Sequence, residues 1–174
     1  MRRLVILLTL VLTASTSVAL SGAVSAAGNG GGQSGYVTGG GRYDLAECPI
    51  NFSVSAHNGP NGANGTQTAT LSNAPGGIPG CPGQGHIKAT VTCVAIDGNN
   101  AEIRGIITEQ SGSLGPDAFP PGNVFVTDVQ DNSGSGQPDR IQQSVEPNGT
   151  ENDCVAPAFD EVFTVDHGDV TVHG

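Results

Sequence analysis

The sequence predicts an all-β protein, an antiparallel β-sandwich or barrel of about 8–9 short strands with long disulfide-stapled loops. Short segments rich in Val, Ile, Thr and Phe alternate between apolar and polar residues, and no segment has the spacing of an amphipathic helix. Turn residues separate these segments, since the chain contains 27 Gly and 11 Pro. Strand periodicity and frequent turns together indicate the fold class.

The N-terminus has the three parts of a secretory signal peptide. Arg2 and Arg3 give a positive start, Leu4 to Leu12 form a short apolar core, and small residues lead up to Ala26. The apolar core is too short for a membrane anchor, because a spanning helix needs ~20 apolar residues. We therefore expect residues 1–27 to be removed by cleavage after Ala26 or Ala27. The protein is then secreted, either free outside the cell or associated with the cell wall.

The remaining chain is expected to form one acidic domain. Residues 28–35 are rich in Gly and predict a flexible tail, and residues 36–174 predict a single all-β domain. The whole chain has 6 Lys and Arg against 16 Asp and Glu, a net charge of −10. This balance opposes binding to nucleic acid, since phosphate contacts need clustered basic side chains. We therefore expect the partner to be an extracellular protein or a glycan. We also expect the protein to be a monomer and to have no membrane span.

The first half of the domain predicts three strands. Tyr36 to Tyr43 has strand residues on both sides of a Gly triplet, which is typical of a bulge or a tight crossing. A phosphate loop is disfavoured there, because neither a helix nor the required Lys follows. Ile50 to Ala56 alternates apolar and polar residues, and Thr66 to Leu71 is rich in Thr. His57 to Gly65 lies between these two strands and predicts turns throughout.

The clearest pattern is a β-hairpin from His86 to Glu109. His86 to Ile96 is β-branched and alternating, Asp97 to Asn100 is a turn with a Gly at a position where positive φ is favoured, and Ala101 to Glu109 returns. Alternate residues of the first strand are expected to share one face: Ile87, Ala89, Val91, Cys93 and Ala95.

Asn123 to Val145 predicts two further strands around a polar loop. Val124 to Val129 carries apolar residues on both faces, which favours a strand near the centre of the sheet. Arg140 to Val145 returns. Two short strands, Glu161 to Val165 and Asp169 to His173, end the chain. We expect the last strand to lie near the first, since that placement protects sheet edges.

Four cysteines follow the predicted cleavage point: Cys48, Cys81, Cys93 and Cys154. An even number in an exported chain indicates disulfides, with three possible pairings. Zinc is disfavoured because no pair has C-x-x-C spacing. We favour Cys48–Cys81 and Cys93–Cys154, in which each bridge closes a long loop. The sequence alone leaves the other pairings open.

Four segments, taken in order, resemble those of one family. They are VTGGG near the mature N-terminus, HIKATVTCVAIDGNNAEIRGII, VFVTDVQDNSGSGQPDRI, and DHGDVTVHG at the end. Over most of the mature chain they resemble the secreted bacterial β-domain proteins often labelled "post-COAP-1 domain" proteins. The segment GTQTATL departs from the Gly-rich L-x-Y strand that is usual before the VTC hairpin. The resemblance implies a bacterial β-domain and supports pairing Cys93 with Cys154, and the family has no established activity.

The loop from Asp128 to Asp139 is the best candidate for an ion site. Ca²⁺ takes about 6–8 oxygen ligands, and Asp128, Asp131 and Asp139 together with Asn and Ser offer them compactly. The spacing is not that of an EF-hand, because no Glu closes the loop and Pro138 interrupts its second half. The competing interpretation is a polar hairpin loop in which Asp and Asn side chains cap turns. Calcium is the one cofactor that the sequence suggests.

No group of residues in the sequence predicts a catalytic centre. Asp166 to Asp169 could pair an acid with a base, but Asp and Gly at such a position are also typical of a hairpin turn. A glycosidase cleft is disfavoured because the chain has no Trp and its tyrosines are Tyr36 and Tyr43.

We therefore predict a non-enzymatic, secreted or cell-surface β-domain that acts as an interaction or structural module. One alternative is a small extracellular hydrolase or a calcium-binding module that uses the Asp128 to Asp139 loop. Another is a secreted inhibitor that presents a disulfide-tethered loop to its target.

Overall fold

The computed structural model describes residues 34–45, 48–72, 83–112, 119–155, 159 and 162–174. The predicted signal peptide and residues 28–33 of the predicted tail lie outside the described residues, and strand pairing begins at Gly35. Within the part of the chain that is described, no helix is long and apolar enough to cross a membrane.

Nine β-strands and one short 3-10 helix make up the described fold, which confirms the predicted all-β class. In chain order they are β1 (Gly35–Leu45), β2 (Cys48–Gly59), β3 (Gly62–Leu71), β4 (Gly85–Asp97), β5 (Asn100–Gly112), β6 (Val124–Gln130), η1 (Ser133–Ser135), β7 (Arg140–Glu146), β8 (Phe163–Thr164) and β9 (His167–His173).

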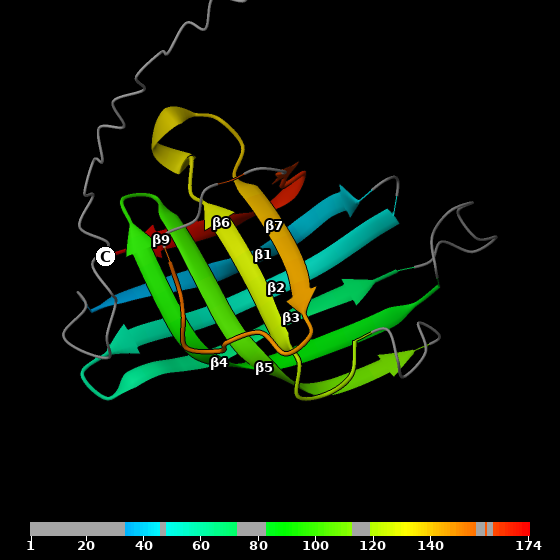
Figure 1. The fold of residues 1–174 in the computed structure, drawn as a ribbon. Helices are drawn as coiled ribbons and strands as arrows, with labels where there is room; N and C mark the ends of the chain where they lie inside the picture. The colour runs from blue at the N-terminus through cyan, green and yellow to red at the C-terminus, as the bar shows by residue number, and fades with distance from the viewer. Residues whose placement is uncertain (1–33, 46–47, 73–82, 113–118, 156–158, 160–161) are drawn as a thin grey trace, which may run out of the picture.

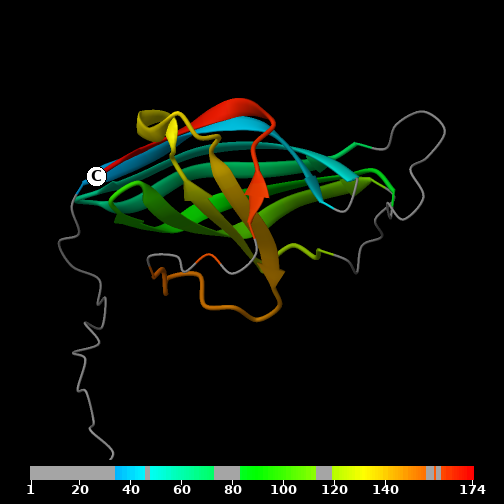
Figure 2. The ribbon, with the colours of Figure 1, turned by 90° about the horizontal axis from the view of Figure 1, so that it is seen from above.

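All nine strands pair antiparallel in one sheet with the order β8-β7-β6-β5-β4-β3-β2-β1-β9. Strands β1 to β8 follow one another as an up-and-down meander, and β9 then pairs with β1, as predicted for the last strand. The sheet curls into a half-barrel, so that its two ends in the pairing order approach each other (Figures 1 and 2).

A two-residue link joins the two ends of the sheet. The N–H of Val165 donates to the carbonyl oxygen of Asp139 at 2.9 Å, next to β7. The N–H of Asp166 donates to the carbonyl oxygen of Arg42 in β1 at 2.8 Å. Because β8 lies on β7 and β9 lies on β1, these two bonds close the half-barrel at this point.

The concave face of the sheet holds the core. Alternate residues of each strand point inward, as the strand period of 2 requires. The larger of two apolar clusters takes buried residues from seven strands and from Val165 in the link: Val37, Tyr43, Ile50, Phe52, Val54, Ala56, Val91, Val94, Ala101, Ile103, Val129, Ile141, Val165 and Val170. Each fully buried Val, Ile or Phe stabilises the fold by ~1.5–3 kcal/mol relative to its exposed state.

The prediction of turns throughout His57 to Gly65 is wrong. β2 and β3 continue their ladder through His57↔Asn64 and Asn58↔Ala63, so that only Pro60 and its neighbour Asn61 connect the strands. Turn-forming residue types occupy strand positions here because the ends of β2 and β3 pair with each other up to the two-residue turn.

The Gly triplet of β1 provides a close approach and no bulge. The pairing of β1 with β2 and with β9 runs through Gly39 to Gly41 without a register shift. A Cβ atom on Gly39 would collide with the backbone of Asp169 in β9, and the φ of Gly39 is 156°. Glycine therefore lets β9 approach β1 closely.

A register shift in β4 reverses the predicted direction of Cys93. Ile87, Ala89 and Val91 are buried on the inner face as predicted, but the pairing with β5 shifts between Val91 and Cys93. After this β-bulge Val94 takes the inner position, so Cys93 points to the outer face. The bulge places the sulfur where the loop after β7 can reach it.

Candidate functional site

The acidic loop between β6 and β7 folds through its own side chains. The carboxylate oxygen Oδ1 of Asp131 accepts from the N–H of Ser133 at 3.0 Å and from its hydroxyl at 2.6 Å. Asn132 Nδ2 donates to the carbonyl oxygen of Pro138 at 2.9 Å, and Ser135 Oγ donates to the carbonyl oxygen of Asn132 at 2.8 Å. These are the local turn bonds that Asp, Asn and Ser form. They support the interpretation of the loop as a polar turn.

Two carboxylates of this loop bind the free edge of β9. Asp139 Oδ2 accepts from the N–H of Val170 at 2.7 Å, and its Oδ1 accepts from the N–H of Asn132 at 2.8 Å. Asp131 Oδ2 accepts from the N–H of Val172 at 3.1 Å. Since β9 pairs with β1 on its other side, these carboxylates satisfy backbone donors that an edge strand would leave open. The loop thus seals the edge of the half-barrel.

The same hydrogen bonds change the acidity of Asp131. Partial burial opposes ionisation of this carboxyl, but the bonds from Ser133 and from the N–H of Val172 outweigh it and lower its pKa. The ionised form is therefore the one that holds β9.

Asp128 lies apart from the other two predicted calcium ligands. It sits in β6 opposite Glu102 of β5, whereas Asp131 and Asp139 bind β9. In the described residues no group of three or more His, Cys, Asp or Glu side chains could hold a metal ion. Calcium at Asp128, Asp131 and Asp139 stays a prediction, and Asp131 and Asp139 already use their carboxylate oxygens to accept backbone N–H bonds.

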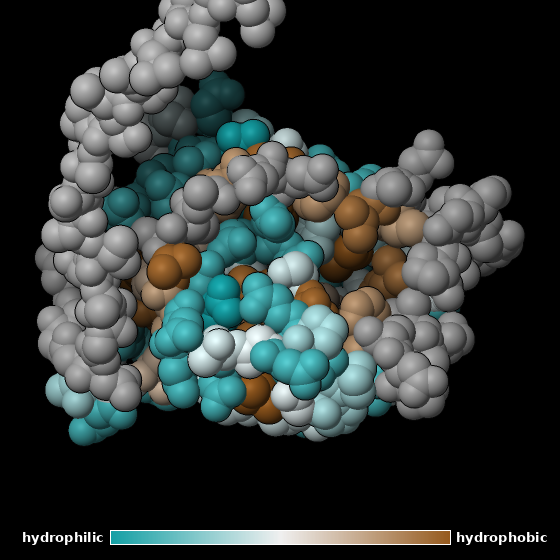
Figure 3. Space-filling model, in the orientation of Figure 1, coloured by the Kyte–Doolittle hydropathy of each residue, from teal (hydrophilic) through white to brown (hydrophobic). Residues whose placement is uncertain are grey.

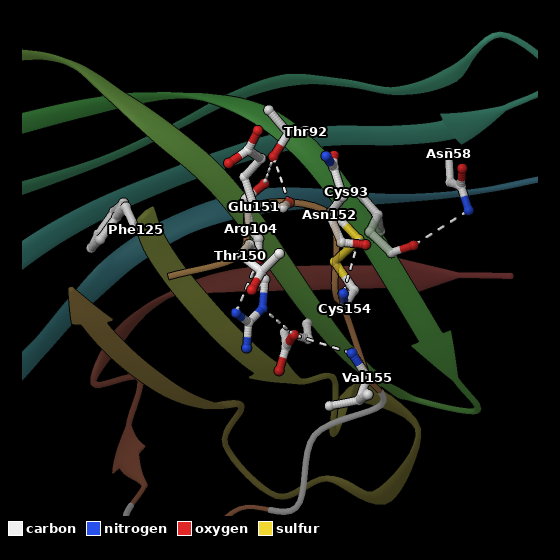
Figure 4. Close-up of a disulfide and its surroundings, with 12 residues drawn as sticks. Asn58, Thr92, Cys93, Arg104, Phe125, Thr150, Glu151, Asn152, Cys154 and Val155 are labelled. Carbon is white, nitrogen blue, oxygen red and sulfur yellow. Dashed lines mark hydrogen bonds and ion pairs between the residues drawn. A yellow bond between two sulfur atoms is a disulfide. The ribbon is translucent and has the colours of Figure 1, made fainter. Parts of the chain in front are cut away.

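A second polar cluster, which the sequence did not indicate, surrounds Arg104 on the outer face of the sheet. Arg104 Nε donates to Glu102 Oε1 at 2.7 Å, and its NH1 donates to Glu146 Oε2 at 2.9 Å. NH1 also donates to the carbonyl oxygen of Thr150 at 3.3 Å, and Glu102 Oε1 accepts from the N–H of Val155 at 3.2 Å. Arg104 therefore ties the loop after β7 to the sheet (Figure 4).

The predicted Cys93–Cys154 disulfide is present and holds the same loop. Beside it, Thr92 Oγ1 donates to the carbonyl oxygen of Glu151 at 2.7 Å. Figure 4 shows the bridge and these bonds on one side of the sheet. The other predicted bridge includes Cys81, which lies outside the described residues, so that pairing stays a prediction. The segment 147–155 thus lies against the sheet through several contacts.

Asp128 lies near Glu102, Arg104 and Glu146, and no ion pair joins it to a Lys or Arg side chain of the described residues. Burial, with the nearby charge of Glu102, raises its pKa from 3.8 to about 7, although Arg104 acts in the opposite direction. Its Oδ1 is buried without a hydrogen-bond partner among the described residues. The folded protein therefore holds this proton more tightly than the unfolded chain does.

Replacing Asp128 with asparagine is expected to make the protein more stable at pH 8 and to change little at pH 4. The raised folded-state pKa stabilises the protonated form, so the stability of the natural protein falls as the pH rises from about 4 through about 7. Asparagine carries no charge to bury. Since the side chain is partly exposed, we expect a gain on the order of 1–2 kcal/mol. Urea denaturation at both pH values measures it, and an equal difference at pH 4 and pH 8 would contradict the assignment.

An apolar cavity of about 180 Å³ lies at the end of the half-barrel where β1 ends. The apolar part of its lining comes from β1, β2, β3, β4, β6, β7 and the segment before β6: Leu45, Ile50, Ala69, Leu71, Ile87, Phe119, Phe125 and Val145. Hydrophobic residues gather at this end on the right of Figure 3. Tyr43 and Gln143 add polar atoms to the wall. The cavity opens to solvent on one side, and its apolar wall can hold a small apolar molecule.

Sequence reasoning missed this cavity because its lining residues are spread from Tyr43 to Val145. One signal was available. Gln143, which lines the cavity, occupies an inward position of β7, where the alternation calls for an apolar residue. A polar side chain on an apolar face indicates an internal hydrogen-bonding group.

Comparisons of the chain with protein-family models, with curated proteins and with solved structures find no match. The function is therefore inferred from the geometry of the site.

Proposed function

We propose that the protein is a non-enzymatic, secreted binding module that holds a small apolar molecule in the cavity at the end of its half-barrel. The observation that carries this proposal is the apolar lining of a space of about 180 Å³. An enclosed apolar cavity of ~150 Å³ binds benzene; the space here is similar in volume but opens to solvent on one side, so it suits a ligand of that size that is partly covered. Small up-and-down barrels hold single small ligands in the same way.

The use of the acidic side chains supports a binding role over chemistry. Asp131 and Asp139 accept bonds from β9, and Glu102 and Glu146 accept bonds from Arg104. A carboxylate that holds structure in this way is less free to act as an acid or a base. The function proposed here therefore belongs to the apolar interior.

The extracellular protein or glycan that we expect as a partner would bind a different surface, the outer face of the sheet. The outer face of five neighbouring strands carries a row of hydroxyl side chains in register: Thr171, Thr38, Ser55, Thr66 and Thr90. Hydroxyl groups both donate and accept hydrogen bonds, as a glycan partner requires. This surface supports the binding of a polar partner as a second proposed role.

Benzene is expected to raise the melting temperature of the natural protein. At a concentration ten times its Kd a ligand that binds only the folded state adds about 1.4 kcal/mol to the free energy of unfolding. The variant Ala69→Leu fills the cavity and should lose most of this gain, whereas Thr66→Leu on the outer face of the same strand should keep it. Calorimetric melting with and without benzene measures the effect. No shift with benzene, or the same shift in Ala69→Leu, would refute the site.

A further inference from the structure

A chain of polar side chains runs along the wall of the apolar cavity. The hydroxyl of Tyr43 donates to Oε1 of Gln143 at 3.1 Å, and Nε2 of Gln143 donates to Oγ1 of Thr127 at 3.1 Å. Tyr43 is 2 % exposed and Thr127 is 1 % exposed, so the chain lies inside the half-barrel. Both Tyr43 and Gln143 line the cavity itself.

Among the described residues, these bonds leave one donor and one acceptor beside the cavity without a second partner. A Gln amide has two N–H groups, and Gln143 uses one of them on Thr127. The hydroxyl oxygen of Tyr43 keeps its lone pairs after donating its proton to Gln143. The bonds to Gln143 and to Thr127 are those that Tyr43 and the Gln143 amide make within the described part of the chain. A ligand atom that both donates and accepts would satisfy the two groups.

The lining favours a neutral ligand. No charged side chain lines the cavity among the described residues. Burial raises the pKa of Tyr43, because these surroundings disfavour a charged group. An ionised ligand would enter without a counter-charge, which costs far more than the burial of a neutral hydroxyl.

We propose that the cavity selects a neutral molecule the size of phenol, with an apolar body and a single hydroxyl group. The hydroxyl donates to the oxygen of Tyr43 and accepts from the free N–H of Gln143, and the body packs against Ile87, Phe125 and Val145. This inference rests on the proposed function of the same cavity. It adds the chemistry by which one small molecule is preferred over another.

Titration calorimetry with phenol, fluorobenzene and benzene tests the proposal, first on the natural protein and then on two variants. We expect phenol to bind roughly three- to tenfold more tightly than the other two, as one extra hydrogen-bonded hydroxyl predicts. The double variant Tyr43→Phe/Gln143→Met should lose this preference and still bind benzene. Gln142→Met, which changes the outward neighbour on β7 opposite Asp128, should keep the preference.

The outcomes separate the two proposals. Equal binding of all three molecules would overturn the selection by a hydroxyl and leave the apolar site intact. A preference for phenol that survives the double variant would also overturn it, because another group would then bind the hydroxyl. Absence of binding by all three molecules would overturn the proposed function together with this inference.

Discussion

Replacing Asp139 with alanine is expected to lower the free energy of unfolding by about 2–5 kcal/mol, since each buried group left without a partner costs ~1–3 kcal/mol. The carboxylate is 6 % exposed and accepts from the N–H groups of Val170 and Asn132. The variant removes both acceptors inside the fold. It also frees the edge of β9, which the acidic loop otherwise seals. Equilibrium denaturation in urea measures the loss.

Two further variants serve as controls for the stability loss of Asp139→Ala. Asp169→Ala changes an exposed carboxylate on β9 itself and should alter stability by less than about 0.5 kcal/mol. Asp139→Asn keeps one acceptor oxygen and should fall between the natural protein and the alanine variant. If Asp139→Ala were as stable as Asp169→Ala, the loop would not be what holds β9.

Removing the Cys93–Cys154 bridge with the double variant Cys93→Ala/Cys154→Ala is expected to cost about 3–4 kcal/mol. The bridge joins residues separated by 61 positions, and the entropy of closing so long a loop in the unfolded chain accounts for most of this amount. Changing both cysteines avoids a free thiol. Denaturation in guanidinium, with the natural protein measured under oxidising and reducing conditions, gives the difference.

The bonds of Arg104 should keep part of the loop after β7 on the sheet when the disulfide is removed. Arg104 contacts Glu102, Glu146 and the carbonyl of Thr150 without help from the disulfide. Hydrogen exchange in the double variant should therefore speed up most at Asn152 to Cys154, and less near Glu146 and at Val155, whose N–H donates to Glu102. Uniform exchange across the whole segment would show that the disulfide alone positions it, contrary to this account.

Much of the fold could be predicted from the alternation of apolar and polar residues and from the turn-forming residues between strands. The pattern of His86 to Glu109 predicted the β4–β5 hairpin and its turn, and the last strand lies beside the first as expected. The failures have local causes. Residues typical of turns between His57 and Gly65 sit in paired strands, and a one-residue bulge before Cys93 reverses the face of that side chain. A bulge depends on the partner strand, so the strand's own sequence does not reveal it.

The acidic loop was found from sequence, but its role was not. Its local turn bonds match the polar-loop interpretation, whereas the bonds from Asp131 and Asp139 to β9 join residues more than thirty positions apart. Asp128 separates from them because the register of β6 places it opposite Glu102. Such long-range pairings depend on the closure of the half-barrel. The cavity likewise brings together side chains spread from Tyr43 to Val145, so neither the role of the loop nor the cavity followed from the local sequence pattern.

The central claim is that a ligand binds in the apolar cavity and that the acidic loop is a structural seal. Two-dimensional NMR spectra of the backbone amides, recorded while benzene is added, test it most directly. The account predicts that the signals of Ile87, Phe125 and Val145 move with a common Kd, while those of Ser133 to Ser135 stay in place. Shifts confined to the acidic loop, or none at the residues that line the cavity, would contradict it.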